Sequence, residues 1–105
     1  MIRLNRGDVV TALFFQDNQR TGVVVISTDF QASENVTLCP ITSTLVGGSL
    51  RVRVLPGASG LTMTSEVMPY RVTTLPLSRI GTVVGRLSDT EVENLNRILK
   101  EWLNL

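Results

Sequence analysis

The sequence LCPITST at residues 38–44 joins an apolar strand segment to a cluster of hydroxyl side chains. The apolar segment reaches Pro40 and Ile41, and the hydroxyl residues Thr42, Ser43 and Thr44 follow. We therefore expect hydrogen-bonding side chains at the open end of a sheet. Arg20 precedes a second apolar segment at residues 23–26. A cation near a hydroxyl cluster is suited to binding a phosphate group.

The length and composition of the chain indicate one globular domain over residues 1–105. A chain of 105 residues can bury a modest core, and the formal net charge is +1. No segment approaches the roughly 20 apolar residues of a membrane span, and the N-terminus lacks the apolar middle of a signal peptide. We therefore expect a cytoplasmic protein that has no membrane partner.

Few of the side chains that usually bind metals or transfer protons are present. Histidine is absent, and the single cysteine, Cys39, lies inside an apolar segment, so we expect a buried and unreactive thiol. A zinc site and an internal disulfide are excluded. A carboxylate-bound magnesium ion is harder to exclude, but the acids before residue 87 show no clustered spacing: Asp8, Asp17, Asp29, Glu34 and Glu66. We expect no metal and no cofactor.

Arginine dominates the basic residues and is concentrated before the last segment. Up to residue 86 the chain has eight arginines and five acids, whereas residues 87–105 contain two bases and four acids. Arginine is suited to planar, bidentate recognition of phosphate. Two interpretations stay open here: a solvated arginine-rich surface, or a local patch that binds nucleic acid.

Apolar runs and alternation predict six short strands. We expect them at residues 7–15, 23–27, 36–42, 50–55, 61–68 and 70–75. Residues 16–22 are interpreted as a polar connection, 28–35 as a loop and 76–86 as an irregular segment. Alternation puts Arg51 and Arg53 on one strand face, where they meet solvent or, alternatively, an RNA backbone. We expect Glu66 and Arg79 to form surface or interface pairs.

The end of the chain changes to a helical period. Ser88 and Glu91 form the pattern of a capping box, and apolar residues then recur at helical spacing: Val92, Leu95, Leu99 and Trp102. The chain is therefore expected to be mostly β with a C-terminal helix. Short strands at close spacing favour a strongly bent sheet or open barrel that the helix closes on one side.

The order of these segments resembles that of the MazF/PemK/CcdB-like toxins. RGDVV at residues 6–10 is similar to the start of their first strand, and PITS at 40–43 is similar to the strand that carries a catalytic hydroxyl. GL at 60–61 followed by Ser65 resembles their G-L…S-V segment, and GRLSD at 85–89 resembles the approach to their last helix. The resemblance implies a small SH3-like open barrel of about five to seven strands closed by one helix. It also implies a toxin of a type II toxin–antitoxin pair.

The resemblance implies metal-independent cleavage of single-stranded RNA with a sequence preference. The ribose 2′-hydroxyl attacks the adjacent phosphate and leaves a 2′,3′-cyclic phosphate. Arg20 and Thr42 match the catalytic positions, where a cation and a hydroxyl stabilise the developing charge. The residues expected to bind substrate are Thr21, Ser43, Arg51, Arg53, Ser65 and Arg71.

The partners that the resemblance implies are RNA, a second copy of the chain and a cognate antitoxin with a flexible, acidic tail. Two alternatives stay open. A CcdB-like poison of DNA gyrase would act through the end of the last helix, near Trp102. A catalytically inactive member of the fold would bind RNA or antitoxin without cleavage, because the segment around Arg20 is shorter than in the family.

Overall fold

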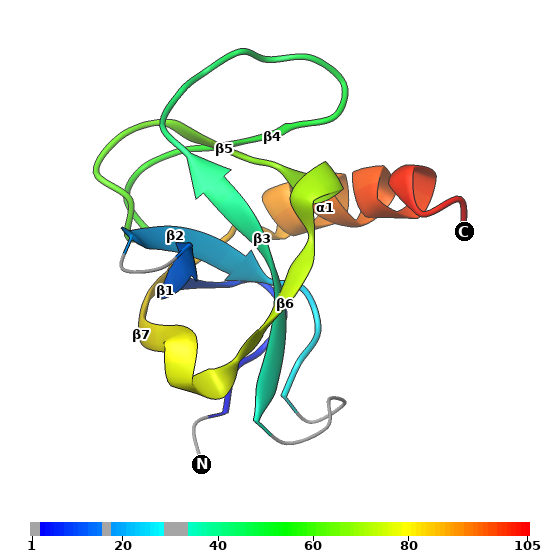
Figure 1. Ribbon diagram of the computed structural model, residues 1–105. Coiled ribbons are helices and arrows are strands. Elements are labelled where there is room, and N and C mark those ends of the chain that lie inside the picture. Colours follow the sequence, from blue (N-terminus) through cyan, green and yellow to red (C-terminus); the bar gives the residue numbers. More distant parts are fainter. Residues whose placement is uncertain (1–2, 16–17, 29–33) are drawn as a thin grey trace.

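The computed structural model describes residues 3–15, 18–28 and 34–105. These residues form a curled antiparallel sheet and one α-helix, α1 (Asp89–Trp102), which lies along one side of the sheet (Figure 1). The strands are β1 (Asp8–Phe15), β2 (Asn18–Val24), β3 (Asn35–Thr42), β4 (Val52–Val54), β5 (Ser65–Val67), β6 (Thr73–Pro76) and β7 (Ile80–Arg86). Two 3-10 turns, η1 (Pro69–Arg71) and η2 (Leu77–Arg79), flank β6.

The sheet curls because β3 has different neighbours along its length. The main strand order is β4-β5-β3-β2-β1-β7, and β6 pairs with β3 off this path. The first half of β3 pairs with β6, whereas Ile41 and Thr42 at its end pair with β5. The result is a half-barrel of antiparallel strands with one C-terminal helix, which confirms the expected fold class.

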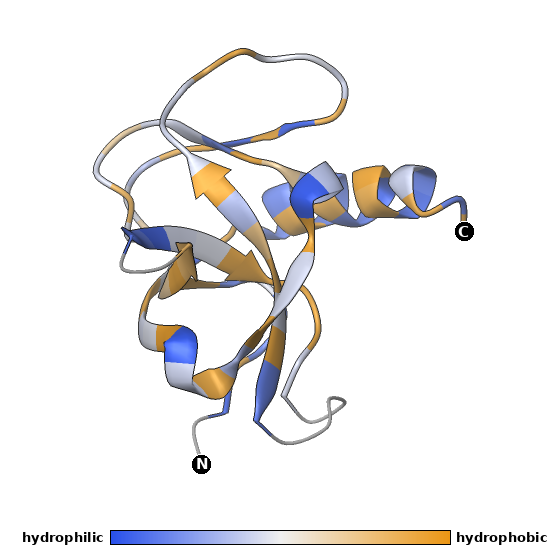
Figure 2. Ribbon diagram, viewed as in Figure 1, coloured by the Kyte–Doolittle hydropathy of each residue, from blue (hydrophilic) through white to orange (hydrophobic). Residues whose placement is uncertain are grey.

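The sheet buries apolar side chains on both of its faces. Residues that alternate along β1, β2 and β3 divide between two clusters. Figure 2 shows the apolar residues of these strands in orange. Val9, Val23 and Cys39 lie in the cluster that contacts α1, whereas Val10 and Val24 lie in the cluster on the opposite face. Val23, Val24 and Val25 are all buried, so the end of β2 and the residue after it are covered on both faces of the sheet, whereas Ile26 is exposed.

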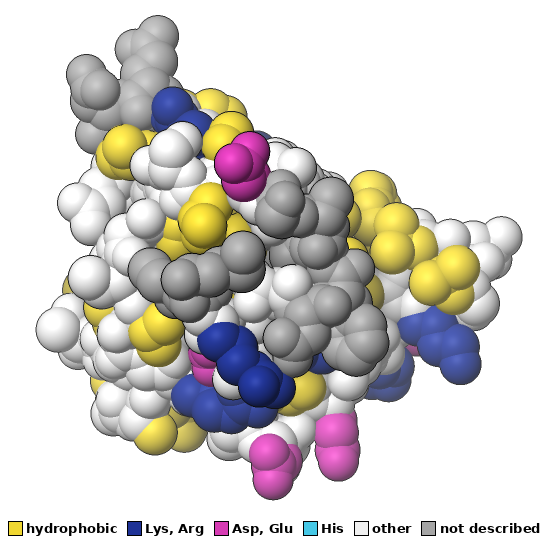
Figure 3. All heavy atoms as spheres, turned by 90° about the horizontal axis from the view of Figure 1, so that it is seen from below, with side chains coloured by type: hydrophobic (Ala, Val, Ile, Leu, Met, Phe, Trp, Pro, Cys, Tyr) yellow, Lys and Arg dark blue, Asp and Glu magenta, His cyan; other side chains and the backbone are white. Residues whose placement is uncertain are grey.

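Helix α1 begins as the sequence predicts. The Ser88 hydroxyl accepts from the Glu91 N–H at 3.1 Å, and the Glu91 carboxylate accepts from the Ser88 N–H at 2.8 Å. Leu95, Ile98 and Leu99 are buried against the sheet. The outer end of the helix is different, because it presents apolar side chains to solvent (Figure 3): Trp102, Leu103 and Leu105.

Two predictions about segments near the first strand are wrong. The expected connection at residues 16–22 is a strand from Asn18 onward, because β1 and β2 form a long hairpin in which Arg20 pairs with Ala12. Residues 16 and 17 lie outside the described residues, as do residues 29–33 of the expected loop. The expected irregular segment contains β7, which pairs with β1.

The middle of the chain also differs from the prediction. β4 and β5 have three residues each, so Leu50 and Leu61 lie in connections rather than strands. All three residues of β5 are buried, which removes the expected alternation. The start of the strand expected at 70–75 is the turn η1, because Pro69 fixes its first backbone angle and favours helical geometry.

In the described part of the chain, no helix has the length and apolar character that crossing a membrane requires.

Candidate functional site

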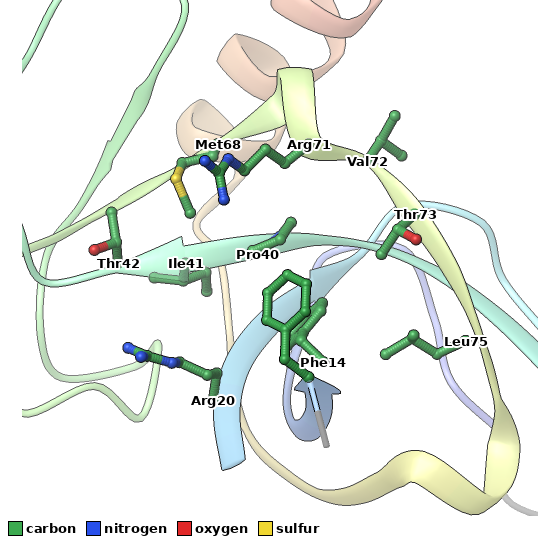
Figure 4. A pocket seen from close by; sticks show the side chains of 11 residues that line it. Phe14, Arg20, Pro40, Ile41, Thr42, Met68, Arg71, Val72, Thr73 and Leu75 are labelled. Atoms are coloured by element: carbon green, nitrogen blue, oxygen red, sulfur yellow. The ribbon is translucent and has the colours of Figure 1, made fainter. Parts of the chain in front are cut away.

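Two adjoining hollows lie on the sheet where β2 begins and the antiparallel strand β3 ends. The larger has a volume of about 590 Å³ and the smaller about 370 Å³. Arg20, Ile41 and Thr42 line both hollows, so these residues mark the place where the two meet. In Figure 4, Arg20 and Thr42 lie at one end of the larger hollow and Leu75 lies at the other.

Strand register brings the cation and the hydroxyl together. β2 and β3 are antiparallel, and Gly22 pairs with Pro40. Continued by two residues, this register puts Arg20 across from Thr42 and on the same face of the sheet. Two residues that the resemblance selects from separate segments therefore meet at one point.

Gly22 makes room for the aromatic side of the larger hollow. A Cβ at this position would lie 2.8 Å from the Phe14 ring and 2.9 Å from Leu38 Cδ1. Because glycine has no Cβ, the Phe14 side chain can lie across β2 and line the hollow. Phe14 also packs against the second apolar cluster, so this ring joins core and site.

Thr42 and Arg20 have the contacts that phosphate binding requires. The Thr42 hydroxyl accepts from the Thr44 N–H at 3.1 Å, which leaves its own O–H to donate to a ligand oxygen. Arg20 is exposed, and no carboxylate of the described residues forms an ion pair with it. Its guanidinium group can therefore donate to an anion in either hollow.

The other expected substrate-binding residues divide into two groups. Thr21, Ser43 and Ser65 line the smaller hollow, and Arg71 lines the larger one. Arg71 extends from η1 toward β3, beside Met68 (Figure 4). Ser65 is buried, and its hydroxyl donates to the Met63 carbonyl at 3.0 Å, so it stabilises the start of β5.

Arg51 and Arg53 lie outside both hollows and pair with Glu66. Each guanidinium group lies 3.0 Å from one carboxylate oxygen. The expectation that Glu66 forms a surface or interface pair is wrong, because its side chain is 2% exposed. The cost of burying this charge is offset because the carboxylate also accepts from the backbone N–H groups of Val46 and Gly47, at 3.0 Å each.

Hydrogen bonds keep this buried carboxylate ionised. The Val46 N–H, and then the guanidinium groups of Arg53 and Arg51, lower the pKa of Glu66 to about 2, although burial acts in the opposite direction. Hydrogen bonds to Tyr70 and to Glu66 raise the pKa of Arg51, so its positive charge is retained.

Two further residues have structural contacts. The expected burial of Cys39 is confirmed, and burial raises the pKa of its thiol to about 12, against a smaller lowering by Arg6, which disfavours the reactive thiolate. Arg79 Nε donates to the Leu13 carbonyl at 2.6 Å, which ties this arginine to β1. Within residues 3–15, 18–28 and 34–105, no three His, Cys, Asp or Glu side chains form a group that could hold a metal ion.

Several residues that line the hollows were not among the expected site residues. Met68 and Pro40 line the larger hollow, and Gln19, Thr62 and Met63 line the smaller one. The sequence pattern predicts a connection at Gln19 and a strand at Thr62, and it contains no signal that these two residues meet. For Pro40, its position two residues before Thr42 on an alternating strand is a signal that could have been used.

Similarity to known proteins agrees with this arrangement. Residues 5–103 match the family model of PemK-like, MazF-like toxins of type II toxin–antitoxin systems. The chain belongs to this family. It is 32% identical, over 107 aligned positions, to a probable endoribonuclease MazF of Mycolicibacterium smegmatis. The match covers 97% of this chain and 98% of that protein.

Solved structures share the fold of this MazF-like chain. The Mycobacterium tuberculosis toxin MazF-mt6 superposes with a TM-score of 0.82 at 24% identity, covering 93% of this chain and 97% of that one. A mycobacterial endoribonuclease in complex with its cognate antitoxin has a TM-score of 0.82 at 20% identity, covering 95% of this chain and 94% of that one. At these identities the likeness establishes the MazF-like fold and nothing beyond it.

Proposed function

We propose that this toxin is an endoribonuclease that cleaves single-stranded RNA at the junction of the two hollows. One observation carries the proposal: Arg20 and Thr42 line both hollows, so a phosphate bound between them has nucleotides on either side. The curated relative from M. smegmatis is a probable endoribonuclease, which supports the same activity in this chain.

In the proposed reaction the ribose 2′-oxygen attacks the adjacent phosphorus and loses its proton to solvent water. The bond from phosphorus to the 5′-oxygen breaks, and the leaving oxygen takes up a proton. The products are a 2′,3′-cyclic phosphate and a 5′-hydroxyl. Arg20 stabilises the extra negative charge on the phosphorane and assists proton transfer, and the Thr42 hydroxyl donates to a phosphate oxygen. Because arginine stays protonated, most of the rate comes from positioning and electrostatics.

The lining of the hollows suits an extended RNA strand. Phe14 and Phe15 offer aromatic faces to unstacked bases in the larger hollow, and Arg71 offers a cation to a phosphate there. Thr21 and Ser43 offer hydroxyls in the smaller hollow, next to Arg20. Arg51 and Arg53 are left out of the substrate site, because both are held by Glu66.

The same site suits an antitoxin. A related mycobacterial endoribonuclease has been solved in complex with its cognate antitoxin. We call the two adjoining hollows together the groove. We infer that the antitoxin of this chain blocks the groove with a flexible acidic tail. The carboxylates of this tail meet Arg20 and Arg71, and its apolar residues meet Phe14. We further propose that the toxin acts as a homodimer in the cytoplasm.

The test is cleavage of a mixed single-stranded RNA by the purified, antitoxin-free protein in EDTA, with mapping of the new 5′-hydroxyl ends. We expect cuts at preferred sequences, and a loss of at least about 100-fold in rate for Arg20→Ala. Thr42→Ala should lose about 10- to 100-fold, because one donor to the charged phosphate is removed. Arg97→Ala is the control, since Arg97 lies on α1 and pairs with Glu101.

An inactive wild-type protein that still binds RNA would contradict the proposal and favour a binding member of the fold. Activity that survives in both Arg20→Ala and Thr42→Ala would show that cleavage occurs elsewhere.

A further inference from the structure

Arg51 lies outside the two hollows and makes three different contacts. Its Nη1 donates to the Glu66 carboxylate at 3.0 Å and to the Thr44 carbonyl at 3.0 Å, and its Nε donates to the Tyr70 hydroxyl at 3.2 Å. The side chain is only 14% exposed. This arginine therefore joins β4 to the segment after β3 and to the turn η1.

Two of these contacts connect Arg51 to residues that line the hollows. Thr44, whose carbonyl Arg51 holds, donates its own N–H to the Thr42 hydroxyl at 3.1 Å. Tyr70, whose hydroxyl Arg51 holds, directly precedes Arg71 in the larger hollow. Arg51 therefore contacts both the residue that donates to Thr42 and the residue that precedes Arg71.

Glu66 holds Arg51 in this position. It pairs with Thr42 across β3 and β5, and it pairs with Arg53 across β4 and β5. Its carboxylate also accepts from the N–H groups of Val46 and Gly47, so the connection after Thr44 is tied to the same group. These hydrogen bonds fix the connection after Thr44 to the sheet beside Thr42, which carries the candidate catalytic hydroxyl.

We propose that Arg51 is a positioning residue, which fixes the Thr42 hydroxyl and the turn carrying Arg71 relative to one another. The inference rests on the proposed ribonuclease function for its effect on rate. It differs from direct RNA binding by Arg51, because the guanidinium group donates to three groups of the protein itself: Tyr70, Thr44 and Glu66.

The chain supplies a matched control. Arg53 pairs with the same carboxylate, through Nη2 at 3.0 Å, but it makes no contact with Thr44 or Tyr70 among the described hydrogen bonds. Arg51→Gln and Arg53→Gln each remove one cation from Glu66. Only Arg51→Gln also releases Thr44 and Tyr70, so any additional effect of this variant reports on positioning.

Arg51→Lys is the second variant, in case Arg51→Gln does not fold. A lysine keeps the positive charge beside Glu66, but a single ammonium group cannot reproduce the fork that reaches Thr44 and Tyr70 together. We expect this variant to fold and to show the same loss of positioning.

The experiment compares wild type and the three variants on a short RNA that contains one mapped cut site. We expect kcat to fall about 10- to 100-fold in both Arg51 variants, and to change less than about threefold in Arg53→Gln. Hydrogen exchange of the Thr44 amide, measured without RNA, should be faster in both Arg51 variants than in Arg53→Gln. The salt dependence of RNA binding should be unchanged in all three.

Two results would overturn the proposal. If Arg51→Gln and Arg53→Gln have equal effects on kcat and on Thr44 exchange, Arg51 has no positioning role beyond its ion pair. If the slope of log K against log salt becomes shallower by about 0.7 in Arg51→Gln alone, Arg51 binds a phosphate directly. If the wild type cleaves no RNA, the proposed function fails, and the Thr44 exchange still decides whether Arg51 fixes this segment.

Discussion

Glu66 is a carboxylate enclosed by donors, and its ionisation should make the stability of the protein depend on pH. Its pKa is about 2 in the folded protein and about 4.3 in an unfolded chain. Because the folded value is the lower one, the carboxylate stabilises the fold fully above about pH 5, and this stabilisation is lost as the pH falls toward 2.

We therefore expect Glu66→Gln to unfold at a lower urea concentration than wild type at pH 7, with a difference that shrinks progressively between pH 5 and pH 2. An amide has one acceptor oxygen, so its NH₂ group faces either Arg53, at the place of Oε2, or Val46 and Arg51, at the place of Oε1. Urea unfolding at a series of pH values measures the effect, with the exposed Glu93→Gln as the control. A difference between Glu66→Gln and wild type that stays constant over this range would contradict the assignment.

At the scale of the element, helix α1 depends on its first turn. The reciprocal hydrogen bonds between Ser88 and Glu91 satisfy two N–H groups that the helix cannot satisfy itself. Ser88→Ala should lower the free energy of unfolding by about 1 kcal/mol. Ser49→Ala, in an exposed loop, should change it by less than about 0.5 kcal/mol. Equal values for the two variants in urea titrations would show that the cap contributes nothing.

The elements that could be predicted from the sequence are those with a strong period. The helix is clear because Leu95, Ile98 and Leu99 repeat along one face and Ser88 marks its start. β7 could not be predicted, because Val83 and Val84 are both exposed and its pairing with β1 is irregular. The start of β2 could not be predicted either, since Asn18, Gln19 and Arg20 are all exposed and show no alternation of apolar residues.

The same physical reason limits prediction of the site. Arg20 and Thr42 could be selected through the family resemblance, but that selection left Arg20 in a polar connection rather than in a strand beside Thr42. The network around Arg51 could not be foreseen, because Glu66, Thr44 and Tyr70 are distant in the sequence and are joined only by the pairing of β4, β5 and β3.

At the scale of the whole molecule, RNA cleavage and gyrase poisoning would use two different regions of the structure. The groove lies where β2 begins and β3 ends, whereas a gyrase poison would contact its target through the tip of α1. Trp102 is 49% exposed at this tip, and its ring meets the edge of Tyr70 with the centroids 6.1 Å apart. The buried side chains of α1 do not depend on Trp102, so the fold should survive its removal.

We expect Trp102→Ala to retain RNA cleavage within about threefold and to lose about 0.5–1.5 kcal/mol of stability, which is the range for an aromatic pair. Cleavage assays and urea unfolding of the same preparation measure both effects. When expressed without antitoxin, the variant should still arrest growth, and Thr42→Ala should not. If Trp102→Ala folds but no longer arrests growth, while wild type traps DNA gyrase and leaves RNA intact, the toxin acts through the tip of α1 and the groove is not its active site.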